Sequence, residues 1–351
     1  MPPSNTPFDL DRLTHYLEAH IDGFQGPISV KKFAGGQSNP TYLLNAPSGQ
    51  YVLRSKPPGE LLQSAHAVDR EYIVTQALKD TAMPVARPYC LCEDISIIGS
   101  MFYVMSYSAG RQFWNPTLPE VHQDERAPIY NEAIRVMAAL HDVDSNAVGL
   151  SGYGKHGNYF ERQLARWSKQ YRAAETETIE PMEALLKWLP ANLPQDNGQV
   201  SLIHGDYKFD NIIFHPDQPE AIALLDWELS TLGHPMADLA YFSMCLRLPP
   251  SGYIQGLKGL DRRALGVLDE QAIIARYCEL RGIEKINNWT FYLVFSFFRL
   301  AAIAQGVLKR ALDGNASNDA ALQLGNQTGE LAQMAVDLLE NHPVDSETSA
   351  H

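Results

Sequence analysis

The chain has 351 residues, of which 45% are hydrophobic, 20% charged and 10% aromatic; its formal net charge is −13 and its pI is about 5.3. A chain of this length exceeds one ordinary hydrophobic core, so we expect two domains or a two-lobed unit. The acidic balance argues against nucleic acid or an anionic membrane as the main partner, because both reward clustered Lys and Arg.

The sequence shows no pattern of secretion or of membrane insertion. Residues 1–20 lack a basic stretch followed by an apolar one. Residues 291–308 approach the length of a membrane span, but Arg299 and Gln305 interrupt them, so we predict a buried helix of a soluble domain. The cysteine spacing does not complete a zinc site, which predicts free thiols in a cytoplasmic protein. These cysteines are Cys90, Cys92, Cys245 and Cys278.

The first hundred residues predict a small, mostly antiparallel sheet with one inserted helix. An amphipathic helix is expected at residues 8–21. Strands are expected at 30–33, 41–44 and 51–55, followed by a helix at 68–78. Two more strands are predicted within residues 96–108, around Gly99 and Ser100.

Beyond Gly110 the pattern changes to helices. They are predicted at residues 128–141, 159–174 and 181–189 and in a helix-rich tail at 269–341, with two strands at 211–214 and 221–226 between them. The chain therefore predicts an α+β protein. Its small β-rich N-terminal lobe would span residues 1–106, and its larger α-helical C-terminal lobe would span residues 107–351.

The segment HGDYKFDNIIFHPDQPEAIALLDWE, residues 204–228, carries the chemistry. A tight turn joins its two strands into a hairpin, so the loop before the hairpin and the residue after it lie at the same end. Asp206, Asn211 and Asp226 are expected to converge there. Carboxylate and amide oxygens suit Mg²⁺, which completes its shell with substrate phosphates, and a nearby carboxylate can orient and deprotonate a hydroxyl. Phosphoryl transfer needs little more.

The order Asp206-x-Lys208-x-x-Asn211 matches the catalytic loop of protein kinases. HGDYKFDN followed by LLDWE more closely resembles the aminoglycoside phosphotransferase and choline kinase branch, and within it the phosphotransferase domains associated with acyl-CoA dehydrogenases. That resemblance covers roughly residues 33–317 and implies a bilobal protein kinase-like fold. It is carried by YVLRSKPPGELLQSAHAVDREY, GNYFERQLARWSKQY, LGHPMADLAYF and FYLVFSFFRLAAIAQGVLKRALDGNAS.

The resemblance implies roles for the motif residues. Asp206 would accept or orient the substrate hydroxyl, and Asn211 and Asp226 would bind Mg²⁺. Lys208 would neutralise the transferred phosphoryl group, although aminoglycoside phosphotransferases often lack this lysine. Asp226 is followed by Trp and Glu where protein kinases have D-F-G, so a D-F-G type of switch is not expected.

The N-terminal lobe would bind ATP. The turn AGGQSNP occupies the place of the kinase Gly-rich loop; it either contacts phosphate or is a plain hairpin turn. Its candidate phosphate contacts are Gly35, Gly36, Ser38 and Asn39. Arg54 stands where protein kinases have the strand lysine, and guanidinium binds phosphate well. Glu71 either pairs with Arg54 or belongs to a solvated charged face with Asp69 and Arg70.

The hinge and the acceptor site are less sharply marked. Adenine is expected near backbone groups of Ser106 and Ser108, with Met105 and Tyr107 as apolar neighbours. The resemblance places the acceptor on the helical lobe, with candidates Arg162, Arg166, Trp167, Tyr292, Phe295 and Arg299. An arginine in an apolar helix is costly to bury unpaired, so Arg299 binds an anionic substrate group or forms a structural ion pair. His204 and Asp238 would hold the catalytic loop.

We therefore expect an ATP- and Mg²⁺-dependent phosphotransferase acting on a small-molecule hydroxyl group. The resemblance implies a hydroxyacyl-CoA or related hydroxy acid as acceptor, and a functional association with an acyl-CoA dehydrogenase. The alternatives are an aminoglycoside or amino-alcohol kinase, a catalytically silent kinase-like binding module, and a protein kinase. The absence of D-F-G and A-P-E argues against the last. The acceptor and the oligomeric state are left open.

Overall fold

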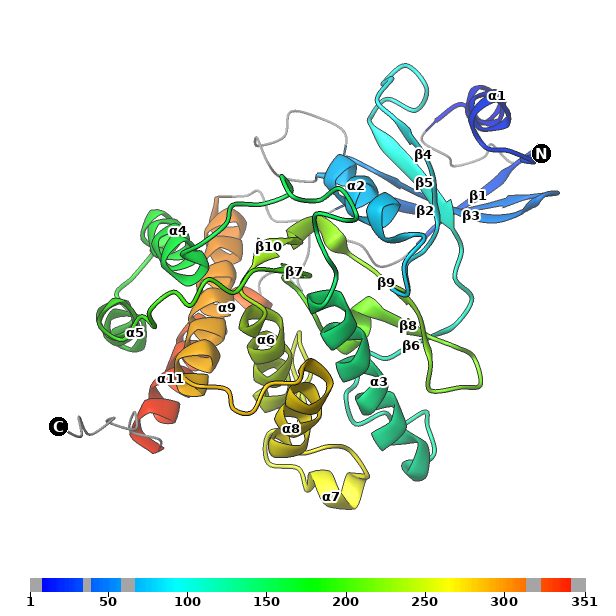
Figure 1. Ribbon diagram of the computed structural model, residues 1–351. Coiled ribbons are helices and arrows are strands. Elements are labelled where there is room, and N and C mark those ends of the chain that lie inside the picture. The colour runs from blue at the N-terminus through cyan, green and yellow to red at the C-terminus, as the bar shows by residue number, and fades with distance from the viewer. Residues whose placement is uncertain (1–7, 34–38, 58–66, 314–322, 342–351) are drawn as a thin grey trace. The chain divides into compact units, whose positions relative to one another are not determined.

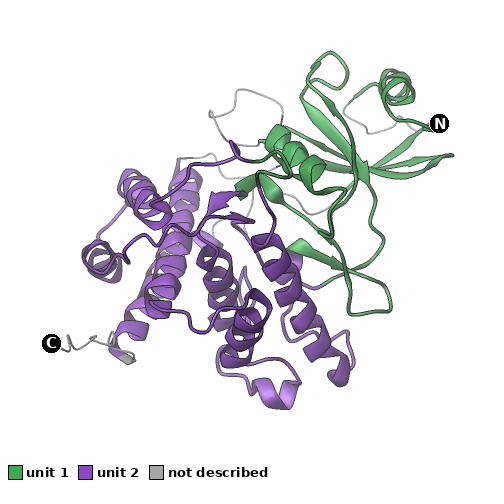
Figure 2. Ribbon diagram, in the orientation of Figure 1, with its two compact units in different colours: residues 1–112, 146–150, 211–230 green, residues 113–145, 151–210, 231–351 purple. Residues whose placement is uncertain are grey.

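The chain folds into two compact units that a single cut in the sequence does not separate. The computed structural model describes residues 8–33, 39–57, 67–313 and 323–341 (Figure 1). The first unit comprises residues 1–112, 146–150 and 211–230, and the second comprises residues 113–145, 151–210 and 231–351 (Figure 2). The predicted division into lobes of residues 1–106 and 107–351 stays a prediction.

A five-stranded antiparallel sheet forms most of the first unit, in the order β1-β2-β3-β5-β4. Its strands are β1 (Ser29–Lys32), β2 (Thr41–Ala46), β3 (Gly49–Ser55), β4 (Pro88–Cys92) and β5 (Phe102–Ser106). Helix α1 (Leu10–His20) packs Leu13 and Leu17 into the core on one face of the sheet. On the other face, Val68 of α2 (Val68–Leu78) packs with Val52 of β3. The predicted sheet with one inserted helix is confirmed.

The prediction of two strands within residues 96–108 is wrong for its first half. Only β5 forms there, and its neighbour at the sheet edge is β4, which was not predicted. Residues 93–99 instead form a turn, because the Asp94 carboxylate accepts a hydrogen bond from the Ser96 amide at 2.8 Å and Gly99 adopts a φ of 89°. Apolar Ile97 and Ile98 pack against the core from this turn, which explains why they resemble a strand in the sequence.

The four cysteines are free thiols, as predicted. Cys90 and Cys92 are two residues apart on β4, so their side chains point to the same face of the strand. Both are buried in the core beneath α1. The C-x-C spacing is therefore a packing feature of this strand.

The predicted hairpin is present in the first unit. Strands β6 (Arg111–Gln112), β8 (Ile212–Phe214) and β9 (Ala221–Leu224) form a small sheet in the order β6-β8-β9. Ile212 pairs with Leu224 in an antiparallel register. The chain then turns through η2 (Trp227–Leu229), a single turn of 3₁₀ helix. The hairpin thus brings the residues just before β8 and just after β9 to one end.

Helices dominate the second unit (Figure 1). They are α3 (Gln123–His141), α4 (Tyr159–Ala174), α5 (Glu180–Ala191), α6 (Met236–Arg247), α7 (Arg262–Leu265), α8 (Glu270–Arg281), α9 (Trp289–Leu312) and α11 (Thr328–Asn341). Strands β7 (Ser201–Ile203) and β10 (Thr231–Gly233) pair antiparallel. Helix α6 was not predicted, because burial on all of its sides removes the polar face that periodicity depends on.

Helix α9 is long and apolar enough to cross a membrane by length and composition, among the residues that the structure describes. Of its most apolar 18-residue window, 78% is buried. The helix packs against α4, α6 and α11 within the second unit (Figure 1). It is thus a helix buried between other helices, as the interrupted apolar pattern predicted.

We predict that Gly110→Ala destabilises the first unit. A Cβ at Gly110 would overlap the Phe214 carbonyl oxygen and lie 2.6 Å from Cγ2 of Ile213, and a backbone atom cannot rotate away. The free energy of unfolding should fall by about 1–3 kcal/mol, measured from urea denaturation. Gly152→Ala is the matched control, because a Cβ there meets nothing within 4 Å. Equal unfolding midpoints for the two variants would contradict the prediction.

Candidate functional site

A buried charge cluster surrounds Arg54 in the first unit. Arg54 lies on β3, and its Nε donates to Oε1 of Glu71 at 3.1 Å. Its Nη2 donates to Oδ1 of Asp226 at 2.5 Å. The expected pairing of Arg54 with Glu71 is therefore present. Because only 1% of Glu71 is exposed, the solvated charged face is excluded for this residue.

The same carboxylates also accept neutral hydrogen bonds. The Tyr103 hydroxyl donates to Oε2 of Glu71 at 3.0 Å. The side-chain amide nitrogen of Asn39, Nδ2, donates to Oε1 of Glu71 at 3.1 Å and to Oε2 of Glu228 at 3.2 Å. Burial, reinforced by Asp226 and Glu228, raises the pKa of Glu71 to about 7 against the opposing effect of Arg54. Three carboxylates thus surround one guanidinium in this cluster.

These residues fit a hard divalent cation. Glu71, Asp226 and Glu228 each offer a carboxylate oxygen, and the three oxygens lie within 4.8 Å of one another. Such a donor set suits Mg²⁺, which binds oxygen and retains sites for phosphate and water. Asn211 directly precedes β8, and its carbonyl accepts from the Leu225 amide at 2.8 Å. The hairpin thus places both predicted Mg²⁺ ligands, Asn211 and Asp226, at one end of the first unit.

The chain after Asp226 is held by local hydrogen bonds. Asp226 itself is left-handed, with φ 64° and ψ 59°, a conformation that costs a non-glycine residue about 1 kcal/mol. The indole N–H of buried Trp227 donates to the Leu224 carbonyl at 2.8 Å. The Ser230 hydroxyl donates to the Trp227 carbonyl at 2.6 Å, and Arg70 of α2 donates to the Ser230 carbonyl. That this segment does not switch like D-F-G stays a prediction.

In the second unit, one buried carboxylate holds the loop that carries Asp206. Asp238 of α6 accepts from the His204 amide at 2.7 Å and from the Gly205 amide at 2.8 Å. Gly205 has a φ of 83°, a conformation that glycine adopts without strain. The His204 ring nitrogen Nδ1 in turn accepts from the Asp206 amide at 3.2 Å. His204 and Asp238 are therefore placed to hold the catalytic loop, as expected.

Lys208 lies between two carboxylates of the same loop. Its Nζ is 3.4 Å from Oδ2 of Asp206 and donates to Oδ2 of Asp210 at 2.5 Å. Although burial alone would lower the pKa of Lys208, Asp206 and Asp210 together raise it above its usual value. Asp210 was not predicted as a site residue. The sequence did offer an indication, because Asp210 is a second acidic residue that follows Lys208 by two positions.

The remaining nucleotide-site predictions are only partly visible. Gly35, Gly36 and Ser38 lie outside the described residues. Asn39 is fully buried, and its amide is directed at the Glu71 and Glu228 carboxylates. Its predicted contact with phosphate stays a prediction.

At the predicted hinge, two backbone donors are already engaged. The Ser106 amide donates to the Arg87 carbonyl at 2.8 Å, and the Tyr107 amide donates to the Gln50 carbonyl at 3.4 Å. Met105 is buried and pairs with Val52 of β3, whereas Tyr107 is exposed. Adenine recognition at Met105, Ser106, Tyr107 and Ser108 stays a prediction.

The predicted acceptor residues divide into surface and core. Arg162 donates to the Lys155 and His156 carbonyls, and exposed Arg166 lies over the Trp167 ring at 5.2 Å. Tyr292 and Phe295 both pack on Phe160 in a buried aromatic cluster.

Arg299 is also buried, and its Nη2 donates to the Gly205 carbonyl at 2.7 Å. The structural partner of Arg299 is thus a backbone carbonyl, where the sequence had suggested an ion pair. Acceptor binding by Arg162, Arg166, Trp167, Tyr292 and Arg299 stays a prediction.

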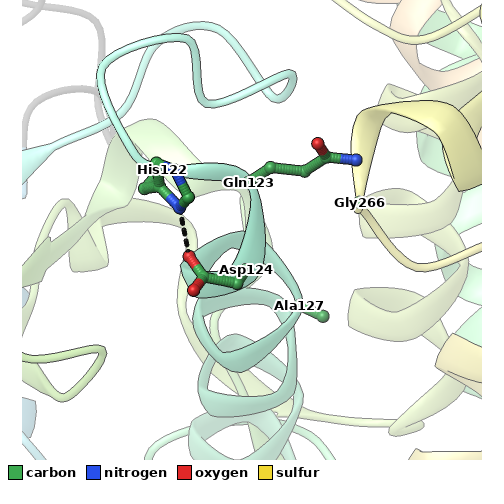
Figure 3. A pocket seen from close by; sticks show the side chains of 5 residues that line it. All are labelled: His122, Gln123, Asp124, Ala127 and Gly266. Atoms are coloured by element: carbon green, nitrogen blue, oxygen red, sulfur yellow. Dashed lines mark hydrogen bonds and ion pairs between the residues drawn. The ribbon is translucent and has the colours of Figure 1, made fainter.

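An open hollow of about 430 Å³ lies elsewhere in the second unit (Figure 3). It is lined by His122, Gln123, Asp124, Ala127 and Gly266. The exposed His122 ring and the Asp124 carboxylate lie 2.5 Å apart at its edge (Figure 3). None of the predicted site residues lines this hollow, so it does not bear on the phosphotransferase chemistry.

The sequence profile of the phosphotransferase enzyme family matches residues 29–270. A Ralstonia eutropha protein of solved structure, provisionally named an aminoglycoside phosphotransferase, is 46% identical, with a TM-score of 0.87 over 95% of this chain and 99% of that one. A thermostable variant of aminoglycoside phosphotransferase APH(4)-Ia, solved with ADP and hygromycin B, is 15% identical, with a TM-score of 0.60 over 92% of this chain and 97% of that one. These likenesses confirm the predicted kinase-like α+β fold.

A longer protein is also similar to this chain. Acyl-CoA dehydrogenase family member 10 from Mus musculus is 45% identical over 329 residues, which make up 93% of this chain and 31% of that protein. The chain spans less than half the length of the curated relatives it matches. The predicted resemblance to domains associated with acyl-CoA dehydrogenases is confirmed.

We predict that Asp238→Asn loosens the catalytic loop. The His204 and Gly205 amides are bonded to different oxygens of the carboxylate, so an asparagine would turn its NH₂ group, itself a donor, toward one of these two donors. The free energy of unfolding should fall by about 2–3 kcal/mol, and the amides of the loop should exchange hydrogen faster. Urea denaturation and hydrogen exchange would measure the two effects.

The matched control is Asp269→Asn. Asp269 is the exposed N-cap of α8, and asparagine caps a helix equally well. If both variants unfold at the same urea concentration, Asp238 does not hold the loop.

A second prediction concerns pH and His234, which lies just before α6. Burial lowers the pKa of His234 to about 4, below its usual 6.5. The unfolded chain therefore binds more protons between these values, and stability is lost as the pH falls through this window. The loss should reach about 2 kcal/mol at pH 5.

The test is His234→Asn. Asparagine preserves an acceptor for the Met236 amide, which donates to His234 Nδ1 at 3.2 Å, but it does not titrate. Urea midpoints at pH 8, 6 and 5 should therefore fall less steeply for the variant. Parallel curves for the two proteins would show that His234 does not cause the acid sensitivity.

Proposed function

Because this chain belongs to the phosphotransferase enzyme family, we propose that it transfers the γ-phosphoryl group of ATP, with Mg²⁺, to a hydroxyl group of a small molecule. One observation carries the proposal: a guanidinium and three carboxylates, from Arg54, Glu71, Asp226 and Glu228, gather at the end of the hairpin that begins after Asn211. Phosphoryl transfer relies on such positioning and charge neutralisation.

The first unit would bind the nucleotide. Arg54 would bind phosphate oxygens with its guanidinium, held in direction by Glu71. Asn211 and Asp226 would hold Mg²⁺, which would neutralise phosphate charge. The contact of Arg54 with Asp226 supports this arrangement, because each of these side chains now neutralises part of the other's charge, as phosphate and Mg²⁺ would do.

The second unit would bind and activate the acceptor. Asp206 would accept a hydrogen bond from the substrate hydroxyl, orient it, and take its proton as the bond to phosphorus forms. Lys208 would hold its charge near the transferred group, since Asp206 and Asp210 keep it protonated. Asp210 fixes the direction of Lys208 through their 2.5 Å hydrogen bond.

We further propose a hydroxyacyl-CoA or related hydroxy acid as the acceptor. The 45% identity with part of a mouse protein named for the acyl-CoA dehydrogenase family supports this choice. Phosphorylation would turn a hydroxyl into a better leaving group and so prepare it for removal. An aminoglycoside or amino alcohol is the second candidate, supported by the net charge of −13, which suits a cationic acceptor.

The proposal predicts ATP turnover that depends on Asp206. Coupled ADP release and ³¹P NMR would be measured with hydroxyacyl-CoAs, hydroxy acids, amino alcohols and aminoglycosides. Asp206→Asn should lower kcat by about 10²–10⁴-fold and leave Mg²⁺-ATP affinity unchanged, because it removes only the group that receives the proton. Arg54→Met should weaken ATP binding instead.

Asp217→Asn is the control, because this exposed residue lies in the hairpin turn. Its turnover should match that of the unchanged protein. If the protein neither binds Mg²⁺-ATP nor turns over any acceptor in an Asp206-dependent way, the enzyme proposal fails and a silent binding module replaces it. Turnover of aminoglycosides or amino alcohols alone would select the second acceptor class.

A further inference from the structure

Arg299 lies buried in the middle of an apolar helix. Only 7% of this residue on α9 is exposed, and its helical neighbours Phe298 and Leu300 are buried apolar side chains. Removing a guanidinium from water is costly unless its donors are satisfied and its charge is compensated. A leucine or methionine would fill the same space without that cost. The contacts of Arg299 therefore need a reason beyond packing.

Two aromatic rings and one carbonyl compensate the buried charge. The Arg299 guanidinium carbon is 5.6 Å from the Trp167 ring centroid and 5.3 Å from that of Tyr241. Such cation–π contacts are strongest where water is excluded. The guanidinium donates to the Gly205 carbonyl at 2.7 Å. Trp167 and Tyr241 thus hold the charge, and Gly205 receives its directed hydrogen bond.

The peptide group between Gly205 and Asp206 is held at both of its ends. Its carbonyl accepts from Arg299, and its N–H, which belongs to Asp206, donates to His204 Nδ1 at 3.2 Å. The preceding N–H of Gly205 donates to Asp238. Glycine has the widest conformational freedom of any residue, so a peptide beside it rotates easily unless it is tied. These ties restrict that rotation immediately before Asp206.

We propose that Arg299 is a positioning residue for Asp206, because it fixes the peptide that precedes Asp206. The inference rests on the proposed function for the statement that Asp206 meets the acceptor. It replaces the substrate-binding role that the sequence suggested for Arg299. The Trp167 and Tyr241 rings compensate the charge of the guanidinium, and the Gly205 carbonyl accepts from one of its donors.

The test is Arg299→Met. Methionine keeps α9 apolar but cannot hold the Gly205 carbonyl, so hydrogen exchange in a peptide covering residues 201–210 should accelerate at least tenfold. The variant should lower kcat about 10–100-fold and leave the KM for ATP within twofold, because a small displacement of a reacting group slows the chemistry. Tyr241→Phe keeps the ring against Arg299, so the hydrogen exchange of this peptide should stay unchanged in that variant.

Two matched controls separate positioning from general destabilisation. Arg247→Lys alters a half-buried arginine whose partner is Glu270. Tyr171→Phe removes a buried hydroxyl for which the described residues offer no hydrogen-bond partner. Neither control should change kcat or the exchange of residues 201–210. Arg299→Lys, which retains one donor and the charge, should restore part of the kcat lost in Arg299→Met.

Two outcomes would overturn the inference. Unchanged hydrogen exchange of residues 201–210 in Arg299→Met would show that Arg299 does not hold the loop. A raised KM for the acceptor with an unchanged kcat in the same variant would make Arg299 a substrate-binding residue. If the unaltered protein turns over no acceptor, the proposed function fails, whereas loop exchange still decides whether Arg299 holds Gly205.

Discussion

The arrangement of the loop that carries Asp206 depends on the hydrogen bonds that the Asp238 carboxylate accepts. It is wholly buried, and it accepts hydrogen bonds from two consecutive loop amides, those of His204 and Gly205. Because Asp238 lies in the first turn of α6, the partial positive charge of the helix N-terminus further stabilises it. The loop is therefore held from the core of the second unit. A buried anion with this many donors stays charged and directional.

His141 extends this support into the helices. One of its ring nitrogens lies 3.2 Å from the Asp238 carboxylate and the other 2.7 Å from the Tyr277 hydroxyl. Burial lowers the pKa of His141, so the ring remains neutral and does not add a second buried charge. Asp238, His141 and Tyr277 thus link α6, α3 and α8 through polar groups in an otherwise apolar core.

The buried charges of the two units have different surroundings. In the second unit, Arg299 and Lys208 each have partners that compensate their charge. In the first unit, three carboxylates lie around Arg54, and Asp226 is held in a left-handed conformation.

Much of the fold was predictable from the sequence, with identifiable exceptions. Helices α2 and α4 have the predicted bounds, since their apolar residues repeat at helical spacing. Helix α6 was missed because it is buried all round, and residues 96–99 were misassigned because apolar Ile97 and Ile98 belong to a turn closed by Asp94. Hydrophobic periodicity does not identify a helix that is buried on all sides. Nor does it identify a turn whose backbone conformation is set by a local hydrogen bond.

The sequence alone determined the hairpin within residues 204–228 and the acids and amide around it, because their spacing is itself a local property. Only the tertiary structure decided what the distant residues do. Arg299 and Gly205 are 94 positions apart, and Asn39 and Glu228 are 189 apart. The polarity of Arg299 in an apolar helix indicated that it had a partner. Which partner it found depends on how α9 packs beside the loop, and no local pattern encodes that contact.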